Sequence, residues 1–288
     1  METRSGVFFA LAAFASWGLL PVYWKFLAGV PSHEILMHRI LWTSVFALAL
    51  VAIAGRSAEV RAILRTPRQL LALTASSLLL AGNWLVFIWA VHRGEIVATS
   101  LGYYLNPMIS VALGVFVLGE TLRPLQLVAV VIAAIGVVAF SVLSGELPWI
   151  SLVLAASFAL YGLIRKQVPV ASIAGIAVET GILAPIAAAG IAWREWHGAG
   201  AFSQPAHHGG HERALLIAAG VVTALPLIWF ASAARRLRLS TIGLLQYLAP
   251  SLALVIAVLA YDEPFTRAHA VSFLFIWTAL ALYSFASW

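Results

Sequence analysis

Three charged residues lie inside long apolar stretches of the sequence: Lys25, Arg39 and Glu179. A charge within a membrane span is costly, and it usually marks a solute pathway or an ion pair. Lys25 lies near the end of its stretch, where its ammonium can reach the membrane surface. Arg39 and Glu179 lie deeper, at depths that differ by only about 7 Å on the 1.5 Å rise per helical residue. We therefore expect them either to form a structural ion pair or to act in gating or coupling. His38 could titrate beside Arg39, although a hydrogen-bonded buried histidine is the commoner case.

Polar side chains also lie where lipid-facing sequence would be apolar. Asn83 and Asn106 are amides, and an unpaired amide in hydrocarbon costs several kcal/mol, so each must face other helices or a wet cavity. Gln246 belongs to the same class in the second half of the chain. Helical spacing places four residues on one face of their segment: Thr99, Tyr103, Asn106 and Ser110. This stripe predicts a central cavity, and the alternative is hydrogen bonding between packed helices.

Five aromatic residues lie deep in the apolar stretches, beside small or polar neighbours: Trp17, Trp84, Tyr103, Tyr161 and Tyr247. Aromatic walls suit flat apolar or cationic ligands, through stacking and cation–π contacts. We expect these residues to line the same cavity. Several of the remaining tryptophans lie at the ends of apolar stretches, where aromatic side chains mark the membrane–water interface.

The sequence predicts neither a metal site nor a cofactor. It contains no cysteine, no phosphate-binding glycine loop and no Ser/His/Asp grouping. Four histidines gather between positions 197 and 211: His197, His207, His208 and His211. His207 and His211 have the i, i+4 spacing of a metal-binding pair on a helix. Because this segment is rich in glycine, we expect a solvated linker rather than a metal-binding helix.

The composition predicts that the elements carrying these residues cross a bilayer. Of the 288 residues, 62% are hydrophobic and 10% are charged, whereas soluble domains carry about 25% charged residues. Stretches of about 20 apolar residues are long enough to span the hydrocarbon core. Ten are present: Gly6–Leu27, Ile35–Ala54, Gln69–Val91, Val97–Leu118, Pro124–Leu143, Pro148–Ile164, Val170–Trp193, Ala214–Ala234, Ser240–Ala260 and Ala268–Ser287. The first is read as a membrane helix and not as a cleaved signal peptide.

Lysine and arginine predict the orientation of the chain. With the N-terminus inside, eleven basic residues fall in cytoplasmic segments and four in outer loops. Both termini are therefore expected in the cytoplasm. The net charge of +6 is then a topology signal. For that reason we do not expect nucleic acid as a partner.

The segment from Glu95 to Val142 recurs, without a gap, from Arg238 to Phe285. The shift of 143 residues superimposes two tyrosines, two prolines and two glutamates: Tyr104 on Tyr247, Pro107 on Pro250 and Glu120 on Glu263. Five spans lie in each half, so the second copy must enter the membrane from the opposite face. We predict an all-α polytopic fold of two inverted five-helix repeats, residues 1–145 and 146–288.

Proline interrupts the same helix of each repeat. Pro107 and Pro250 remove a backbone hydrogen bond and are expected to kink their helices. Helices broken at matching positions of two halves indicate a binding site between the repeats of a transporter. We therefore interpret the prolines as bending points of an alternating-access cycle.

The whole chain resembles the drug/metabolite transporter superfamily of EamA type, and within it the RarD-type bacterial permeases. The motifs that carry the resemblance are Trp17-Gly18, Tyr23-Trp24-Lys25, Glu34 with His38-Arg39, Asn83-Trp84, Ser100-Leu101-Gly102-Tyr103, Asn106-Pro107, Gly119-Glu120, Tyr161-Gly162, Arg165-Lys166, Glu179, Gln246-Tyr247, Pro250 and Glu263. The resemblance implies ten helices and transport across a bacterial inner membrane, with export of amino acids, other metabolites or aromatic and cationic drugs. The histidine-rich loop is not part of the family pattern.

The expected activity is therefore transport of a small molecule by a membrane-embedded chain that functions as a monomer, and not catalysis. Two alternatives stay open at this point. An integral-membrane lipid or acyl transferase would need an acid–base group or nucleophile at the membrane surface. A channel or scramblase would open to both faces at once.

Overall fold

The computed structural model describes residues 2–119, 121–203, 209–234, 236–237, 241–242 and 245–286. Within these ranges the fold is helical, with no strand. The helices are α1 (Glu2–Lys25), α2 (Ser32–Ile53), α3 (Ser57–Leu64), α4 (Pro67–Arg93), α5 (Ile96–Leu118), α6 (Pro124–Ser144), α7 (Trp149–Gln167), α8 (Ser172–Trp196), α9 (Gly210–Ala234), α11 (Leu248–Ala260) and α12 (Arg267–Ala286).

Nine of the helices in the described ranges are long and apolar enough to cross a membrane. The apolar helix α11 is shorter, because the predicted span Ser240–Ala260 is interrupted by a turn at Gln246 and Tyr247. An additional short helix, α3, lies in the connection between the second and third predicted spans. The chain is thus a polytopic helical protein.

Proline and glycine mark where the long helices begin and end. Pro67 and Pro124 occupy the first turns of α4 and α6, where a missing backbone N–H costs no helical hydrogen bond. Gly94 and Gly145 end α4 and α6 in the left-handed region, with φ of 76° at both positions. A side chain would strain that conformation. The connections that follow can therefore be short.

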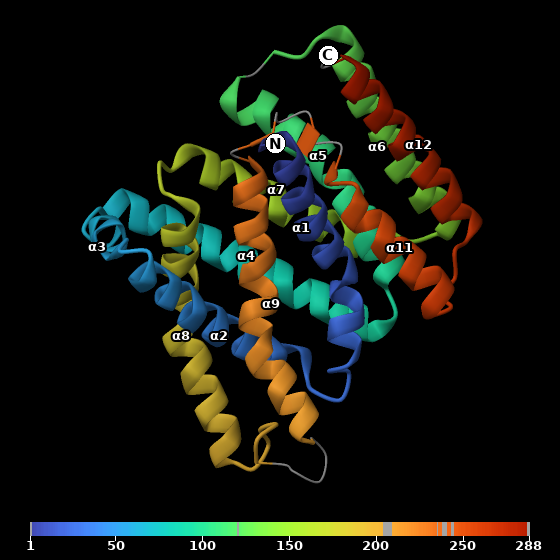
Figure 1. Ribbon diagram of the computed structural model, residues 1–288. Coiled ribbons are helices and arrows are strands. Elements are labelled where there is room, and N and C mark those ends of the chain that lie inside the picture. The colour runs from blue at the N-terminus through green and yellow to red at the C-terminus, as the bar shows by residue number, and fades with distance from the viewer. Residues whose placement is uncertain are drawn as a thin grey trace.

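Helices from the two halves of the chain pack against one another throughout the bundle. In Figure 1, α6 and α12 run side by side although they are far apart in the sequence. Helix α2 packs against α8 and α9, and α1 packs against α9 and α11. Helix α5 lies against α7 and α11, and α4 lies against α7. The two halves form one interleaved structure.

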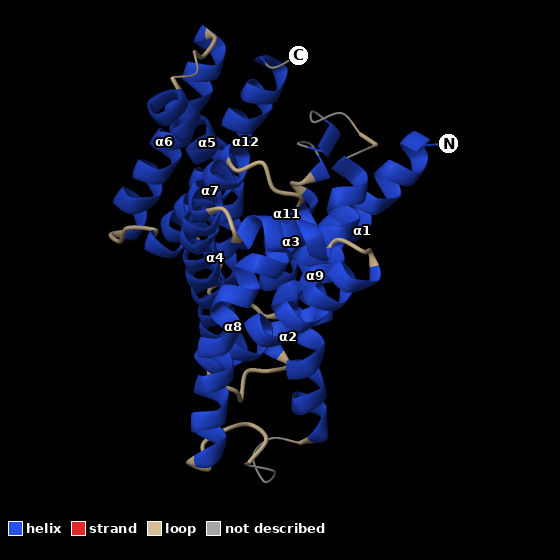
Figure 2. Ribbon diagram, turned by 90° about the vertical axis from the view of Figure 1, so that its left-hand side faces the viewer, coloured by secondary structure: helices blue, strands red, loops and turns tan. Residues whose placement is uncertain are grey.

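The connections between helices gather at two opposite ends of the bundle. Figure 2 shows the N- and C-termini at one end and the α8–α9 connection at the other. We call these the terminal end and the loop end. At the loop end, His92 at the end of α4 contacts the carbonyl of Trp24 at the end of α1, 2.9 Å away. The Lys25 ammonium lies over the Tyr261 ring beside the α11–α12 turn. The helices therefore alternate in direction.

Helix α6 shows how the outer face of the bundle is built. Its exposed side is apolar, with Val128, Val131 and Val138 each about half or more exposed. Its buried side is made of small residues, and a Cβ on Gly136 would lie 2.9 Å from the Cβ of Phe275 in α12. Small residues allow membrane helices to approach closely, while the exposed valines suit contact with lipid tails.

Candidate functional site

A buried cation lies near the middle of the bundle. Arg39, in α2, is only 4% exposed, and its Nε donates a hydrogen bond to the Thr223 hydroxyl of α9 at 3.0 Å. Its Nη1 has no hydrogen-bond partner among the described residues. A buried charge without a counter-ion is costly, because the protein interior replaces little of its hydration. Arg39 is therefore a buried cation without a carboxylate partner among the described residues.

Aromatic rings surround this guanidinium. Its central carbon lies over the ring of Trp84 in α4, 4.0 Å from the centroid, and over the ring of Trp24 in α1 at 5.0 Å. Tyr103 of α5 and Tyr23 of α1 also interact electrostatically with Arg39. Such cation–π contacts stabilise a cation partly, by about 2 kcal/mol or more where water is absent. They supply no negative charge.

The second predicted charge, Glu179, has its own partners. Its Oε1 accepts a hydrogen bond from Ser76 of α4 at 2.6 Å and lies 3.7 Å from Nη1 of Arg165 in α7. Tyr161 lies beside the same carboxylate. A small hollow lies between Glu179 and Trp84, the ring that contacts Arg39, and both side chains line this hollow. In this conformation Arg39 and Glu179 thus bind different partners and not each other.

His38 lies one residue before Arg39 and faces the loop end. Its Nδ1 lies 3.3 Å from Nε1 of Trp42, and its ring stacks on Phe202 at 5.4 Å between centroids. Phe202 belongs to the segment after α8, which folds back over α2. His38 therefore packs beneath a cover at the loop end.

An ion pair holds this segment against α2. The carboxylate of Glu34 in α2 is 1% exposed, pairs with Nη2 of Arg194 at 2.8 Å and accepts a hydrogen bond from its Nε at 3.0 Å. Its other oxygen accepts the backbone N–H of Ala201 at 2.7 Å. Arg194 in turn donates to the carbonyl of Ala199 at 2.6 Å. We call Glu34, Arg194 and residues 199–203 the latch. It closes the loop end between α2 and α8.

A second seal at the loop end joins the two halves. Glu263, in the α11–α12 turn, is buried and accepts the backbone N–H of Val97 at the start of α5, at 2.9 Å. A carboxylate there is favoured by the helix dipole. Burial, together with the carboxylates of Glu263 and Glu146, raises the pKa of Glu95 beside it. Glu120, the repeat equivalent of Glu263, lies outside the described residues.

Tyrosines that the repeat superimposes meet at the centre. Tyr104 of α5 stacks on Tyr247 at 5.9 Å between centroids, with the rings within 13° of parallel. The Tyr104 hydroxyl also lies 2.5 Å from the Ser251 hydroxyl of α11. Gln246, the predicted polar residue of this segment, is half-buried in the turn that precedes α11 and interacts with Tyr247.

The other predicted cavity residues divide into two groups. Asn83 and Thr99 are used in packing: the Asn83 amide donates to the Leu154 carbonyl of α7 at 3.0 Å, and Thr99 bonds to its own helix. Tyr103, Asn106 and Tyr161 are half-buried, as a cavity wall requires. Trp17 is also half-buried, and its ring contacts Phe14 and Phe230.

The two prolines behave differently from each other. Helix α5 continues through Pro107 as one element, whereas Pro250 lies in the first turn of α11. The break in the second copy falls at Gln246 and Tyr247, one turn before its proline. A proline in a first turn removes no helical hydrogen bond. The interruption at Gln246 and Tyr247 therefore precedes Pro250, which costs α11 no hydrogen bond.

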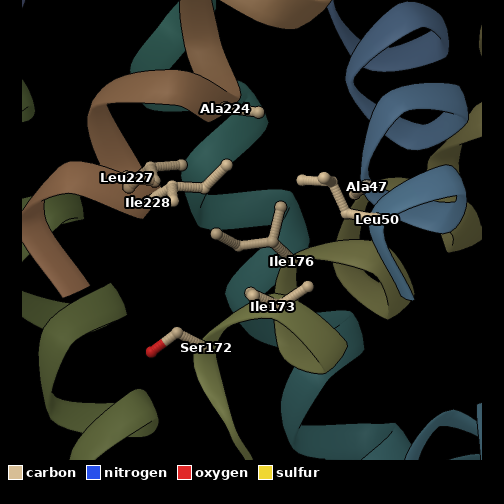
Figure 3. A pocket seen from close by; sticks show the side chains of 8 residues that line it. All are labelled: Ala47, Leu50, Ser172, Ile173, Ile176, Ala224, Leu227 and Ile228. Atoms are coloured by element: carbon tan, nitrogen blue, oxygen red, sulfur yellow. The ribbon is translucent and has the colours of Figure 1, made fainter. Parts of the chain in front are cut away.

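A shallow apolar groove lies between α2, α8 and α9 on the side of the terminal end. Figure 3 shows the side chains that line it: Ala47, Leu50, Ser172, Ile173, Ile176, Ala224, Leu227 and Ile228. None of the residues predicted for the site lies in it. Ala224, however, directly follows Thr223, the hydrogen-bond partner of Arg39.

The described histidines of the histidine-rich segment serve as local contacts. The Nδ1 of His197 lies 2.7 Å from the Trp193 carbonyl, and the His211 ring lies edge-on to Phe26. His207 and His208 lie outside the described residues. Within the part of the chain that the structure describes, no three His, Cys, Asp or Glu side chains are grouped as a metal site would need.

The sequence reasoning did not single out the latch. Glu34 and Arg194 lie at the ends of predicted spans, where charges are ordinary and carry no signal of burial. The signal that could have found them is their similar height: each lies within a few residues of the same predicted membrane face. Thr223 was also missed, because a single threonine in an apolar helix is common.

Comparison with known proteins places this arrangement in a family. A model of the EamA-like transporter family matches residues 4–142. An uncharacterized transporter of Pseudomonas aeruginosa is 43% identical over 99% of this chain and 95% of its own length. Protein RarD of Salmonella typhimurium is 43% identical over 98% of this chain and 95% of its own length.

A solved crystal structure with 18% identity shares the fold. It covers 98% of this chain and 96% of its own, with a TM-score of 0.58. The relatives that are 43% identical over nearly the whole chain indicate a membrane transporter. The family match and the apolar helices indicate the same. The chain belongs to the EamA-like transporter family of the drug/metabolite transporter superfamily, in its RarD-type branch, and is a multi-pass bacterial membrane transporter.

Proposed function

We propose that this transporter is an alternating-access carrier made of two inverted five-span repeats, residues 1–145 and 146–288, in the bacterial inner membrane. It exports small metabolites with an apolar or aromatic body, among them aromatic or neutral amino acids, and acts as a monomer. The observation that carries the proposal is the face-to-face contact of Tyr104 and Tyr247. Residues equivalent by the repeat meet in this way where a two-fold axis relates the halves.

The packing of the helices supports the same symmetry. Exchanging the halves replaces α1, α2, α4, α5 and α6 by α7, α8, α9, α11 and α12. The pairs α2–α8, α5–α11 and α6–α12 then map onto themselves. The pair α1–α9 maps onto α7–α4, and α5–α7 maps onto α11–α1, and all of these pairs are in contact. An inverted repeat accounts for this pattern simply.

The conformational difference between the repeats supports alternating access. The helix with Pro107 is continuous, whereas its counterpart is interrupted at Gln246 and Tyr247. In an inverted-repeat carrier the two halves exchange conformations when the site turns from one face to the other. Because the latch seals the loop end, we assign this structure to the state that is closed at that end.

The charge distribution supports our placing of the terminal end in the cytoplasm. The stretch from Arg56 to the first turn of α4 carries four arginines, Arg56, Arg61, Arg65 and Arg68. Arginine-rich short loops stay on the cytoplasmic side. The loop end then faces outward, and the latch closes the exit from the central site.

Single cysteines test this topology, because the native chain contains none. Ser57 and Ser203 are exposed at opposite ends of the bundle. In intact cells, a membrane-impermeant maleimide is expected to label Ser203→Cys and to label Ser57→Cys only after the membrane is opened. Labelling of both variants in intact cells, with an intact membrane verified by a cytosolic marker, would end the inverted-repeat model.

A further inference from the structure

We propose that Arg39 is the anion-binding group of the central substrate site, so that the transported solute carries a carboxylate beside its apolar body. This inference deepens the proposed function and depends on it for the idea that the site is a transport site. It starts from a difference between Arg39 and the other buried arginines.

Two partly buried arginines, Arg194 and Arg165, have carboxylate partners. Arg194 binds Glu34 at 2.8 Å, and Arg165 lies 3.7 Å from Glu179. Arg39 is more deeply buried than either, yet its hydrogen-bond partner is a neutral hydroxyl, and its Nη1 has none among the described residues. A ligand that brings a negative charge would balance the cation and satisfy its free N–H groups.

The contacts of Arg39 leave it suited to a carboxylate. The central carbon of the guanidinium lies over the rings of Trp84 and Trp24, while its Nη1 has no partner among the described residues and is left for a ligand. A guanidinium binds a carboxylate through two parallel N–H···O bonds. Tyr103 lies close enough to interact with the same charge and has a hydroxyl to offer. The rings also supply an apolar wall for the body of the solute.

The position of Arg39 fits a transport site. Its neighbours come from four other helices, which belong to both halves: Trp24 from α1, Trp84 from α4, Tyr103 from α5 and Thr223 from α9. It begins the third turn of α2, about 10 Å below the loop end at 1.5 Å per residue. It is covered in this conformation. The subsite therefore opens when its aromatic neighbours part.

The charge also decides between solute classes. A cationic solute would approach a buried, uncompensated positive charge, and the repulsion is strong where water is scarce. A phosphate dianion calls for more than one cation, and Arg165 is already paired with Glu179. A monocarboxylate matches a single guanidinium. Aromatic-bearing carboxylates therefore fit this subsite better than aromatic cations do.

The experiment compares four probes that share one ring: phenylacetate, phenylacetamide, 2-phenylethylamine and phenyl phosphate. The purified full chain in nanodiscs is titrated with each, and binding is followed by the intrinsic tryptophan fluorescence and by the unfolding temperature. Phenylacetate is expected to bind at least tenfold more tightly than its amide and its amine. Phenyl phosphate, which separates phosphate from carboxylate recognition, is expected to bind more weakly than phenylacetate.

Variants assign the preference to Arg39. In Arg39→Gln the ratio of the two dissociation constants, for phenylacetamide and phenylacetate, is expected to fall to about one. Arg39→Lys, which keeps the charge but not the planar fork, is expected to retain part of it. The exposed Arg56→Gln is the matched control and leaves the ratio unchanged. Size-exclusion chromatography verifies that each variant is folded.

Three outcomes would overturn the proposal: equal binding of phenylacetate and phenylacetamide, tighter binding of the amine or the phosphate, or an unchanged carboxylate preference in Arg39→Gln. Absence of binding by phenylacetate to the native chain at millimolar concentration counts against it in the same way. The proposed topology is tested separately, because cysteine labelling at Ser57 and Ser203 requires no ligand. Failure of one experiment therefore leaves the other interpretable.

Discussion

Replacing Arg194 by glutamine removes the cation from a carboxylate that is 1% exposed. Glu34 loses two hydrogen bonds, from Nη2 at 2.8 Å and from Nε at 3.0 Å, and keeps the Ala201 N–H at 2.7 Å. Breaking a buried ion pair on one side costs about 3–5 kcal/mol. Because Arg194 is 18% exposed and water can reach the stranded carboxylate, we take about 2–3 kcal/mol. The change destabilises the state that is closed at the loop end.

That loss converts into a measurable change in population. At 1.4 kcal/mol for each factor of ten, about 2–3 kcal/mol raises the ratio of open to closed molecules about 30- to 140-fold. Ala201, a fully buried residue of the latch, reports the opening. The maleimide labelling rate of Ala201→Cys is expected to rise by that factor when Arg194→Gln is added. Opening that is fast compared with labelling makes the rate proportional to the open population.

Two controls belong to this measurement. Ser203→Cys lies two residues further on and is exposed, so its labelling rate is expected to stay constant. Arg56 and Glu59 form an ion pair at 2.7 Å with exposed side chains, and Arg56→Gln is expected to cost less than about 1 kcal/mol. A rise of less than about threefold at Ala201→Cys in Arg194→Gln would refute the latch as the element that closes this end.

Four further variants test the surroundings of single residues. Glu95→Gln is expected to raise the unfolding temperature slightly at neutral pH. The pKa of Glu95 is higher in the folded than in the unfolded chain, so the native protein loses stability as the pH rises from the unfolded pKa through the folded pKa. Glutamine does not titrate, and this pH dependence of stability disappears. Gly102→Ala is expected to cost about 1–3 kcal/mol, because its Cβ would lie 2.9 Å from a carbonyl of α7. Gly82→Ala, where no atom lies within 4 Å, is expected to stabilise by up to about 1 kcal/mol. Asn83→Ala is expected to lower membrane abundance by weakening the contact with α7, and to leave ligand preference unchanged.

Each of these has a result that contradicts it. A stability profile of Glu95→Gln that still falls with pH above 4.5 as the native profile does would show that another group titrates. Equal unfolding temperatures for Gly102→Ala and Gly82→Ala would mean that α5 and α7 are not held at this distance. Normal abundance of Asn83→Ala with altered ligand preference would return this amide to the cavity wall.

The sequence predicted the membrane helices well, because their length and apolar composition follow directly from the bilayer. It located the interruption near Pro250 only within one turn. Proline shows where a helix is weak, but at the turn formed by Gln246 and Tyr247 the Tyr247 ring also stacks on Tyr104. That contact joins residues more than a hundred positions apart, which no local pattern contains.

The charges show the same limit. Counting residues from a span end gives the depth of Arg39 and Glu179, and both were correctly identified as buried within the bundle. Depth alone leaves the direction of each side chain around its helix undetermined. In the folded bundle the Arg39 side chain points toward Trp84 and Thr223, and the Glu179 side chain points toward Ser76. The partners could therefore be found only in three dimensions.

The most direct test of alternating access measures both ends of the molecule in the same chain. Ser110 lies on the polar face of α5 with Asn106, is exposed, and belongs to the half of α5 nearer the terminal end. Labelling by a charged maleimide is measured at Ser110→Cys and at Ala201→Cys, each with and without Arg194→Gln. The account predicts that breaking the latch raises the rate at Ala201→Cys and lowers the rate at Ser110→Cys. Rates that rise together at both positions would contradict it, because they describe a channel open to both faces.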